Sequence, residues 1–529
     1  MSPRHFDVIV LGGGGDALVA SILLARGGRS VQLIMAEDGA GEFNRPFEFA
    51  PGFSASLGLE ADWVPESVLK ALKLDVAYDP PPIPASVALP GGGVLPLSRH
   101  VGDAATAIRE HSPRDAERWP PFMKTLHGLA RFLETLDVTP SADVDTSSIA
   151  DLPSLLSLGR SFRGLGKANM SELLRVLPMP VQDLADEWFT FAPLKAAIGS
   201  AAVRDIRQGP RSGGTSFNLL HHMTGTDDGV LRGRAWCTIY GERAGLAPAL
   251  EQEAKRAGVE ILSGADVERI TVRDDAATGV VLRGGEEIRS KLVLSTLDPV
   301  RTLLGLVDPV WLDPEFLLAV RNIKLRGSTS YVLYALDDFP CEPGSGLARA
   351  LTGMVSLSSS LDGIERAYDA VKYGQVAERP HVEITMPSIR ASGSNGPHVL
   401  VAKVHYTPYA LRGGESWDAT RSSAFGDAIS AAISELLPRI KDLARHRVVL
   451  TPADIENQFD VSGGALTHGE MTLDQMLFMR PVAGWSRYAT PVSGLYLAGP
   501  GTHPGPGIFG ASGLMAARRI LADSKQATS

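Results

Sequence analysis

The apolar and polar positions at the start of the chain predict a strand, a tight turn, a helix and a second strand. Residues 6–11 are mostly Val, Ile and Leu, as in a strand buried on both faces. Glycines occupy 12–15, and residues 18–25 are mostly Ala, Leu, Val and Ile, which favours a buried helix. Residues 30–35 are again mostly apolar and predict the next strand. This order is typical of a βαβ unit with parallel strands.

Further along the chain, the pattern predicts a mixture of helices and strands. Helices are expected at 57–74, 122–136, 182–198, 246–257, 416–437 and 511–522. Strands are expected at 259–262, 265–272, 279–282, 287–295, 330–335, 399–406 and 494–499. Residues 79–84 are rich in proline and predict a stiff linker, whereas 102–200 are expected to be mostly helical. Pro120 and Pro121 stand where proline suits the start of a helix. The pattern as a whole predicts an α/β protein.

Composition excludes several classes of protein. A chain of 529 residues is long enough for two or three domains. The formal net charge of −9 argues against a nucleic acid partner. Cys237 and Cys341 form no CxxC motif, so no local redox disulfide is expected, and a reducing compartment is the natural interpretation. No apolar run is long enough to span a membrane, so we expect a cytoplasmic protein, with peripheral membrane contact left open.

The glycine turn after the first strand has the spacing that a dinucleotide requires. Gly12 permits the tight turn, and Gly14 lets the backbone approach a pyrophosphate closely. Ala17, in place of a third glycine, still allows the helix to pack on the strand. Free N–H groups at the start of the helix then face the phosphates. The alternative is a glycine-rich loop in an ordinary α/β domain.

Several motifs spread over nearly the whole chain resemble one family of flavoproteins. Besides the glycine turn, they are found at 49–53 (FAPGF), 193–196 (PLKA), 219–222 (LLHH), 413–418 (GGESWD), 471–475 (MTLDQ) and 497–505 (LAGPGTHPG). The chain is similar to the phytoene-desaturase-like FAD-dependent oxidoreductases of the amine-oxidase superfamily. This resemblance implies an FAD/NAD(P)-binding Rossmann-type domain of the glutathione-reductase kind, with a discontinuous α+β substrate domain.

The resemblance also implies a domain division. The FAD-binding domain is expected to be discontinuous and to consist of 1–80, 205–300 and 485–529. The substrate domain is expected to have a helical part, 81–204, and a part with mixed sheet and helix, 301–484.

The resemblance implies that FAD lies extended across the first domain. At the pyrophosphate end, Gly12, Gly14, Gly15 and Ala17 are expected to hold the phosphates, and the backbone of Val267 to meet the adenine. The loop from Gly499 to Gly510 is expected to wrap the flavin end. The helix that begins at Ala511 would point its positive N-terminus at the flavin ring, which favours the anionic reduced form.

Three segments depart from the family pattern. An acid that binds the adenosine ribose is expected about 20 residues after the glycines, where this chain has Met35. Glu37 or Asp38 would reach the ribose from the next loop, or both are solvated loop acids. Nearby, Glu42 brings a negative charge toward the phosphates. Arg45 either pairs with a phosphate or is an exposed surface residue.

The third departure is at Glu242 and Arg243, where the family has a glycine-rich run beside the flavin. Either these charged residues pair with one another or with another domain, or they fill part of the flavin site. Together, the three changes leave open an altered cofactor position, a lowered affinity or a lost cofactor.

Flavin chemistry needs few side chains, and no Ser-His-Asp triad or metal site is expected. His503, in the loop at the flavin end, is the one catalytic candidate, with a loop hydrogen bond as the alternative. The predicted function is FAD-dependent removal of a hydride from an apolar or amine-like small molecule. The alternatives are a cofactor-poor relative that acts as a binding or regulatory protein, and a flavin-dependent isomerase.

Overall fold

The computed structural model describes residues 4–36, 42–141, 159–160, 162–239, 246–393 and 395–526. Its first sheet has seven strands in the order β10-β11-β12-β1-β2-β9, with β18 paired to β12. The strands are β1 (Arg4–Leu11), β2 (Val31–Ile34), β9 (Glu260–Leu262), β10 (Val267–Arg273), β11 (Ala276–Leu282), β12 (Glu287–Ser295) and β18 (Leu495–Leu497). Pairing is parallel from β18 through β12, β1 and β2 to β9, and antiparallel from β12 through β11 to β10.

Both faces of this first sheet are buried, which explains the apolar run in β1. Val8 and Val10 pack on one face, against α1 (Gly15–Arg26) and α18 (Ala511–Gln526). Ile9 and Leu11, which point the other way, pack on the opposite face with residues of α11 (Pro314–Arg321). The helices α2 (Glu66–Leu72) and α10 (Leu246–Arg256) also contribute to the first face. The predicted α/β class is therefore confirmed.

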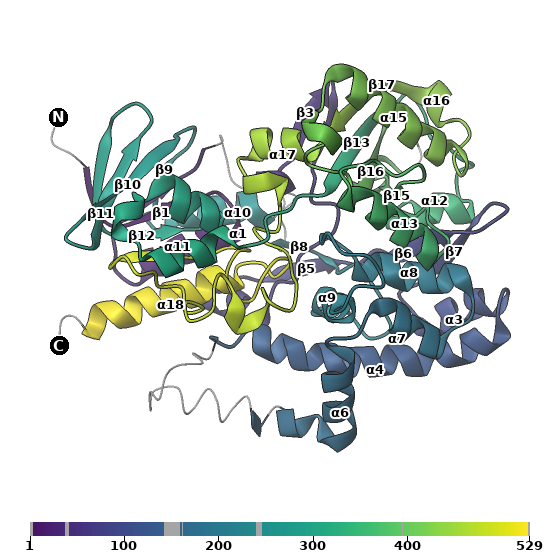
Figure 1. Ribbon diagram of the computed structural model, residues 1–529, viewed down its shortest axis with the longest axis horizontal. Helices are drawn as coiled ribbons and strands as arrows, with labels where there is room; N and C mark the ends of the chain where they lie inside the picture. The colour runs from purple at the N-terminus through teal and green to yellow at the C-terminus, as the bar shows by residue number, and fades with distance from the viewer. Residues whose placement is uncertain are drawn as a thin grey trace.

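A second sheet of seven strands lies across the molecule from the first (Figure 1). In spatial order its strands are β17 (Ala444–Leu450), β13 (Thr329–Leu336), β16 (His398–His405), β15 (His381–Thr385), β14 (Met354–Ser356), β6 (Ala85–Ala88) and β7 (Val94–Leu97). Helix α15 (Ala419–Ser434) packs on one face, and the short sheet of β3 (Phe47–Ala50) and β4 (Phe53–Ala55) lies near the other. Two further strands, β5 (Val76–Asp79) and β8 (Trp236–Ile239), pair with each other.

A helical layer lies beside the second sheet and below it in Figure 1. It consists of α3 (Val101–Arg109), α4 (Pro113–Asp137), α6 (Gly166–Val176), α7 (Val181–Trp188), α8 (Ala192–Ala202) and α9 (Thr215–Met223). The remaining α-helices of the described residues are α12 (Gly346–Ala350), α13 (Leu361–Lys372), α14 (Ile389–Ser392), α16 (Ile440–Leu443) and α17 (Pro452–Phe459). The domain boundaries expected from the sequence stay a proposal; β6 and β7, within the segment assigned to the helical part, pair into the second sheet.

Two predicted helix boundaries were wrong. The helix expected at 57–74 is only α2, Glu66–Leu72, because Ala61 and Trp63 instead form β-bridges with distant Arg234 and Ile508. The helix expected to begin after Pro121 begins at Pro113. There the side chain of Ser112 accepts a hydrogen bond from the N–H of Asp115, at 3.3 Å, so an earlier cap sets the start.

In the part of the chain that the structure describes, no helix has the length and apolar composition needed to cross a bilayer.

Candidate functional site

The glycine turn and the C-terminal loop lie on the wall of one cavity of about 410 Å³. Gly14, Gly15 and Asp16 contribute the wall at the start of α1. Gly499 and Gly510, near the start of α18, lie on the same cavity. The structure therefore brings together two segments that are almost 500 residues apart in the sequence.

The start of α1 is built to leave backbone N–H groups available. Gly12 has a φ of +113°, in the region that favours glycine. Gly14 is the N-cap, and no side chain caps the first turn. A Cβ atom on Gly15 would lie 2.4 Å from the ring of Phe509 in the C-terminal loop. Ala17 is fully buried, so the turn has the open backbone that an anion site needs.

The N-termini of α1 and α18 are joined directly. The carboxylate of Asp16 accepts a hydrogen bond from the N–H of Gly513, at 2.8 Å. Ser512 accepts one from the N–H of Gly499, at 3.0 Å, which fixes the C-terminal loop on its own helix. Ala511, the first residue of α18, is buried.

Helix α9 and Arg234 support the C-terminal loop from the other side. His221 Nε2 lies 2.8 Å from the carbonyl oxygen of Pro506. Burial lowers the pKa of His221 to about 3, so the ring is neutral and donates this hydrogen bond. Arg234 donates to the carbonyls of Gly507 and Thr224. Glycines 505 and 507 on this segment also line the cavity, so α9 fixes the shape of its wall.

His503, the catalytic candidate, lines neither this cavity nor the smaller one described below. Its Nε2 lies 3.0 Å from the carbonyl oxygen of Thr139. The side chain is buried, and burial lowers its pKa to about 4. The structure therefore places His503 in a hydrogen bond to the backbone, the alternative that the sequence left open.

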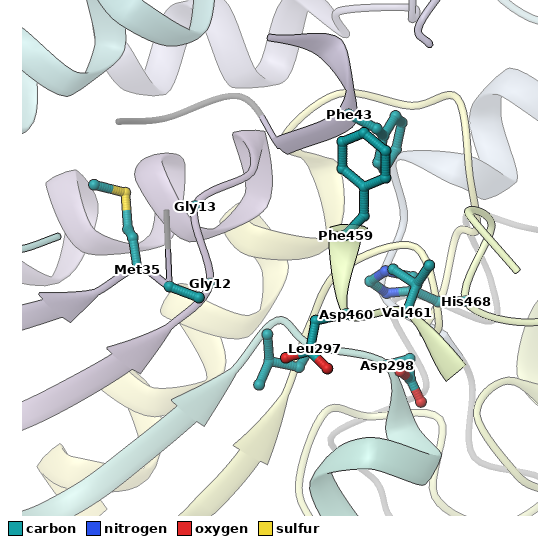
Figure 2. A pocket seen from close by; sticks show the side chains of 11 residues that line it. Gly12, Gly13, Met35, Phe43, Leu297, Asp298, Phe459, Asp460, Val461 and His468 are labelled. Carbon is teal, nitrogen blue, oxygen red and sulfur yellow. The ribbon is translucent and has the colours of Figure 1, made fainter. Parts of the chain in front are cut away.

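The second cavity, of about 70 Å³, lies on the other side of the same glycine turn (Figure 2). Gly12, Gly13 and the end of β2 form one wall, where Met35 is buried. Its opposite wall comes from the loop after β12 and from the end of α17 with the residues that follow. Phe43 lines both cavities, so the two lie next to each other along the turn.

The other predicted cofactor residues are placed less directly. Arg45 lies on the wall of the larger cavity. Val267 begins β10, where it pairs with Leu282, and it lines neither cavity. Glu37 and the neighbouring Asp38 lie outside the described residues, as does the pair Glu242–Arg243.

Two carboxylates on the larger cavity were missed by the sequence analysis. Glu60 and Asp62 both line it, between β4 and α2. Burial opposes ionisation of Glu60, but Arg204 and Arg232 outweigh it and lower its pKa to about 2. For Asp62 burial dominates and raises the pKa above its usual value, although Arg234 acts against this. One wall therefore presents a fixed negative charge and a carboxyl group that takes up a proton more readily.

A buried charge network extends from Glu60 into the second sheet. Arg232 binds both oxygens of Glu60 and both oxygens of Glu383. His405 Nε2 lies 2.9 Å from Glu383, and His381 is nearby, so these three residues have the composition of a metal site. Because Arg232 already supplies the positive charge beside Glu383, the cluster is neutralised by the protein's own residues.

Both cysteines are free and half-buried. Cys237 lies on the larger cavity, and burial raises the pKa of its thiol to about 11. The side chain is therefore a neutral thiol, which does not favour disulfide chemistry at this site.

Comparison with known proteins shows similarity along the whole chain. No protein-family model matches it. A pyridine nucleotide-disulfide oxidoreductase domain-containing protein 2 from Rattus norvegicus is 30% identical over 552 residues, covering 98% of this chain and 94% of that protein. One of the polypeptides of limonene dehydrogenase from Castellaniella defragrans is 23% identical, covering 98% and 95%. The solved structure of cyclohexylamine oxidase from Brevibacterium oxydans matches with a TM-score of 0.59 and 15% identity, covering 98% and 99%, and supports the fold.

Proposed function

The chain belongs to the family of pyridine nucleotide-disulfide oxidoreductase domain-containing protein 2, and on this basis we propose that it is an FAD-dependent oxidoreductase. The finer proposal is that it removes a hydride from an apolar or amine-like small molecule. The family relation confirms the resemblance seen in the sequence.

The observation that carries this proposal is the shared cavity between the glycine turn and the C-terminal loop. Its wall at both segments is backbone with few side chains, as a closely approaching phosphate or flat ring requires. Gly14 and Gly15 are placed to hold phosphate, with Arg45 on the same wall. Gly499 and Gly510 are placed beside the ring system. When bound there, FAD supplies the acceptor for a hydride.

The remaining wall supports an apolar substrate with a polar or cationic group. Val64, Trp236 and Ile508 are apolar groups on the cavity and exclude water from the reacting bond. The charge of Glu60 would attract an ammonium group, and Asp62 is placed to accept a proton. The relative named for limonene, an apolar hydrocarbon, supports the apolar alternative.

A second candidate function is a cofactor-poor relative that acts as a binding protein. Met35 and the small size of the cavity beside it favour this alternative, because Met offers no carboxylate to a ribose.

Purification of the full chain separates the two. The oxidoreductase proposal predicts a yellow protein that releases FAD on heating, or a colourless protein whose melting temperature rises with added FAD. A colourless protein that shows no thermal shift with FAD, while remaining folded, would contradict it and favour the binding protein.

A further inference from the structure

The cavity beside Met35 has an apolar wall and a polar wall. Met35 and Ala36, at the end of β2, form the apolar one. Facing them across the cavity in Figure 2 are the side chains of Asp298, Asp460 and His468. The polar groups that the family pattern leads one to expect on β2 are thus found on the opposite side of the cavity.

His468 has hydrogen-bonding capacity that the described residues do not use. It is 3% exposed, and its Nδ1 atom is buried without a hydrogen-bond partner among them. Leaving a buried polar group unpaired costs about 1–3 kcal/mol. Such a group at the edge of a cavity is best explained by a ligand that completes it.

The position of His468 is fixed by its neighbours in the sequence. Arg480 is buried and donates hydrogen bonds to the carbonyls of Thr467 and Gly469, at 3.2 and 3.0 Å. The same guanidinium donates to the carbonyl of Pro500, at 2.8 Å, so the segment is tied to the C-terminal loop. The imidazole is therefore held rigidly at the cavity, as a ligand-binding group must be.

The two acids on this wall are already engaged. Asp298 accepts from the N–H of Arg301, at 2.8 Å, and from both the N–H and the hydroxyl of Ser462. Asp460 forms an ion pair with Arg301. Among the polar side chains that line this cavity in the described residues, His468 is the one with an unused hydrogen-bonding atom.

We propose that His468 binds the nucleotide half of the cofactor, at a ribose hydroxyl or a phosphate oxygen, in place of the acid missing from the second strand. This inference rests on the proposed FAD binding. A neutral imidazole suits both partners, because one nitrogen donates and the other accepts. Burial lowers the pKa of His468 and favours this neutral form. The polar contact to the nucleotide has thus moved from β2 to the loop after α17.

The test compares wild type with His468→Leu and His468→Asn in titrations of the flavin-free full chain with FAD, FMN and riboflavin. His468→Leu is expected to weaken FAD binding about tenfold, the effect of losing one good hydrogen bond. His468→Asn keeps a polar atom near Nδ1 and is expected to retain most of the affinity. Riboflavin, which has no nucleotide, is expected to bind all three proteins equally. Weaker FMN binding by His468→Leu would identify phosphate as the partner, and unchanged FMN binding would identify the adenosine ribose.

His398→Leu is the matched control, because His398 is equally buried but lies on β16 and lines neither cavity. It is expected to leave FAD affinity unchanged. Without flavin, His468→Leu is expected to melt at or above the wild-type temperature, because it removes an unpaired polar atom. Wild-type FAD affinity in His468→Leu, or equal losses for FAD and riboflavin, would overturn this inference alone. A wild type that binds none of the three flavins would overturn the FAD proposal, and this inference with it.

Discussion

At the scale of single residues, the site depends on where burial and charge act together. Glu60 and Asp62 are two positions apart and lie on the same cavity, yet their pKa values move in opposite directions. Arg204 and Arg232 contact Glu60, at 3.4 and 2.7 Å. For Asp62, burial outweighs the attraction of the nearby arginines and decides its ionisation.

The ion pairs of Glu60 predict a specific dependence of stability on pH. Its pKa is about 2 in the folded protein against a usual value of 4.5, so the stabilisation is complete above pH 4.5 and is lost as the pH falls toward 2. The shift corresponds to about 3 kcal/mol. Glu60→Gln should therefore destabilise the protein strongly at neutral pH, and the difference from wild type should shrink below about pH 4.5.

Denaturant unfolding at several pH values measures this difference. Exposed Glu117 on α4 provides the control, since Glu117→Gln should leave stability unchanged within about 0.5 kcal/mol at every pH. If Glu60→Gln is as stable as wild type at neutral pH, the charge network does not hold this wall.

At the scale of elements, the crossing of α1 and α18 sets the distance between the two glycine segments. Asp16 bonds to the N–H of Gly513, and the two backbones touch at this point. A Cβ atom on Gly513 would lie 2.1 Å from the carbonyl oxygen of Asp16. Because backbone atoms cannot move aside as a flexible side chain can, the helices would have to separate.

Gly513→Ala is therefore expected to destabilise the protein by about 1–3 kcal/mol and to weaken FAD binding. Gly102→Ala, in the first turn of α3 with open space around it, should be neutral or stabilising by up to about 1 kcal/mol. Melting temperatures and flavin titrations of both variants measure this. Equal stability of the two variants would show that the close crossing is not needed.

At the scale of the whole molecule, the sequence predicted the elements whose signal is local. The apolar run of β1, the glycine turn and the periodicity of α18 each lie within one segment, and the structure has them where they were expected. Glu60 and Asp62 gave no such signal, because the arginines that shift their pKa values come from distant parts of the chain. The helix predicted over 57–74 failed for the same reason, since bridges to Arg234 and Ile508 override local propensity.

The central claim is that the glycine turn and the C-terminal loop close around one flavin molecule. Hydrogen–deuterium exchange of the whole chain, with and without FAD, tests this most directly. The account predicts that amides in 12–18 and in 499–512 become protected together, at the same FAD concentration, while α15 in the second sheet is unchanged. Protection of one segment without the other, or of neither, would contradict it.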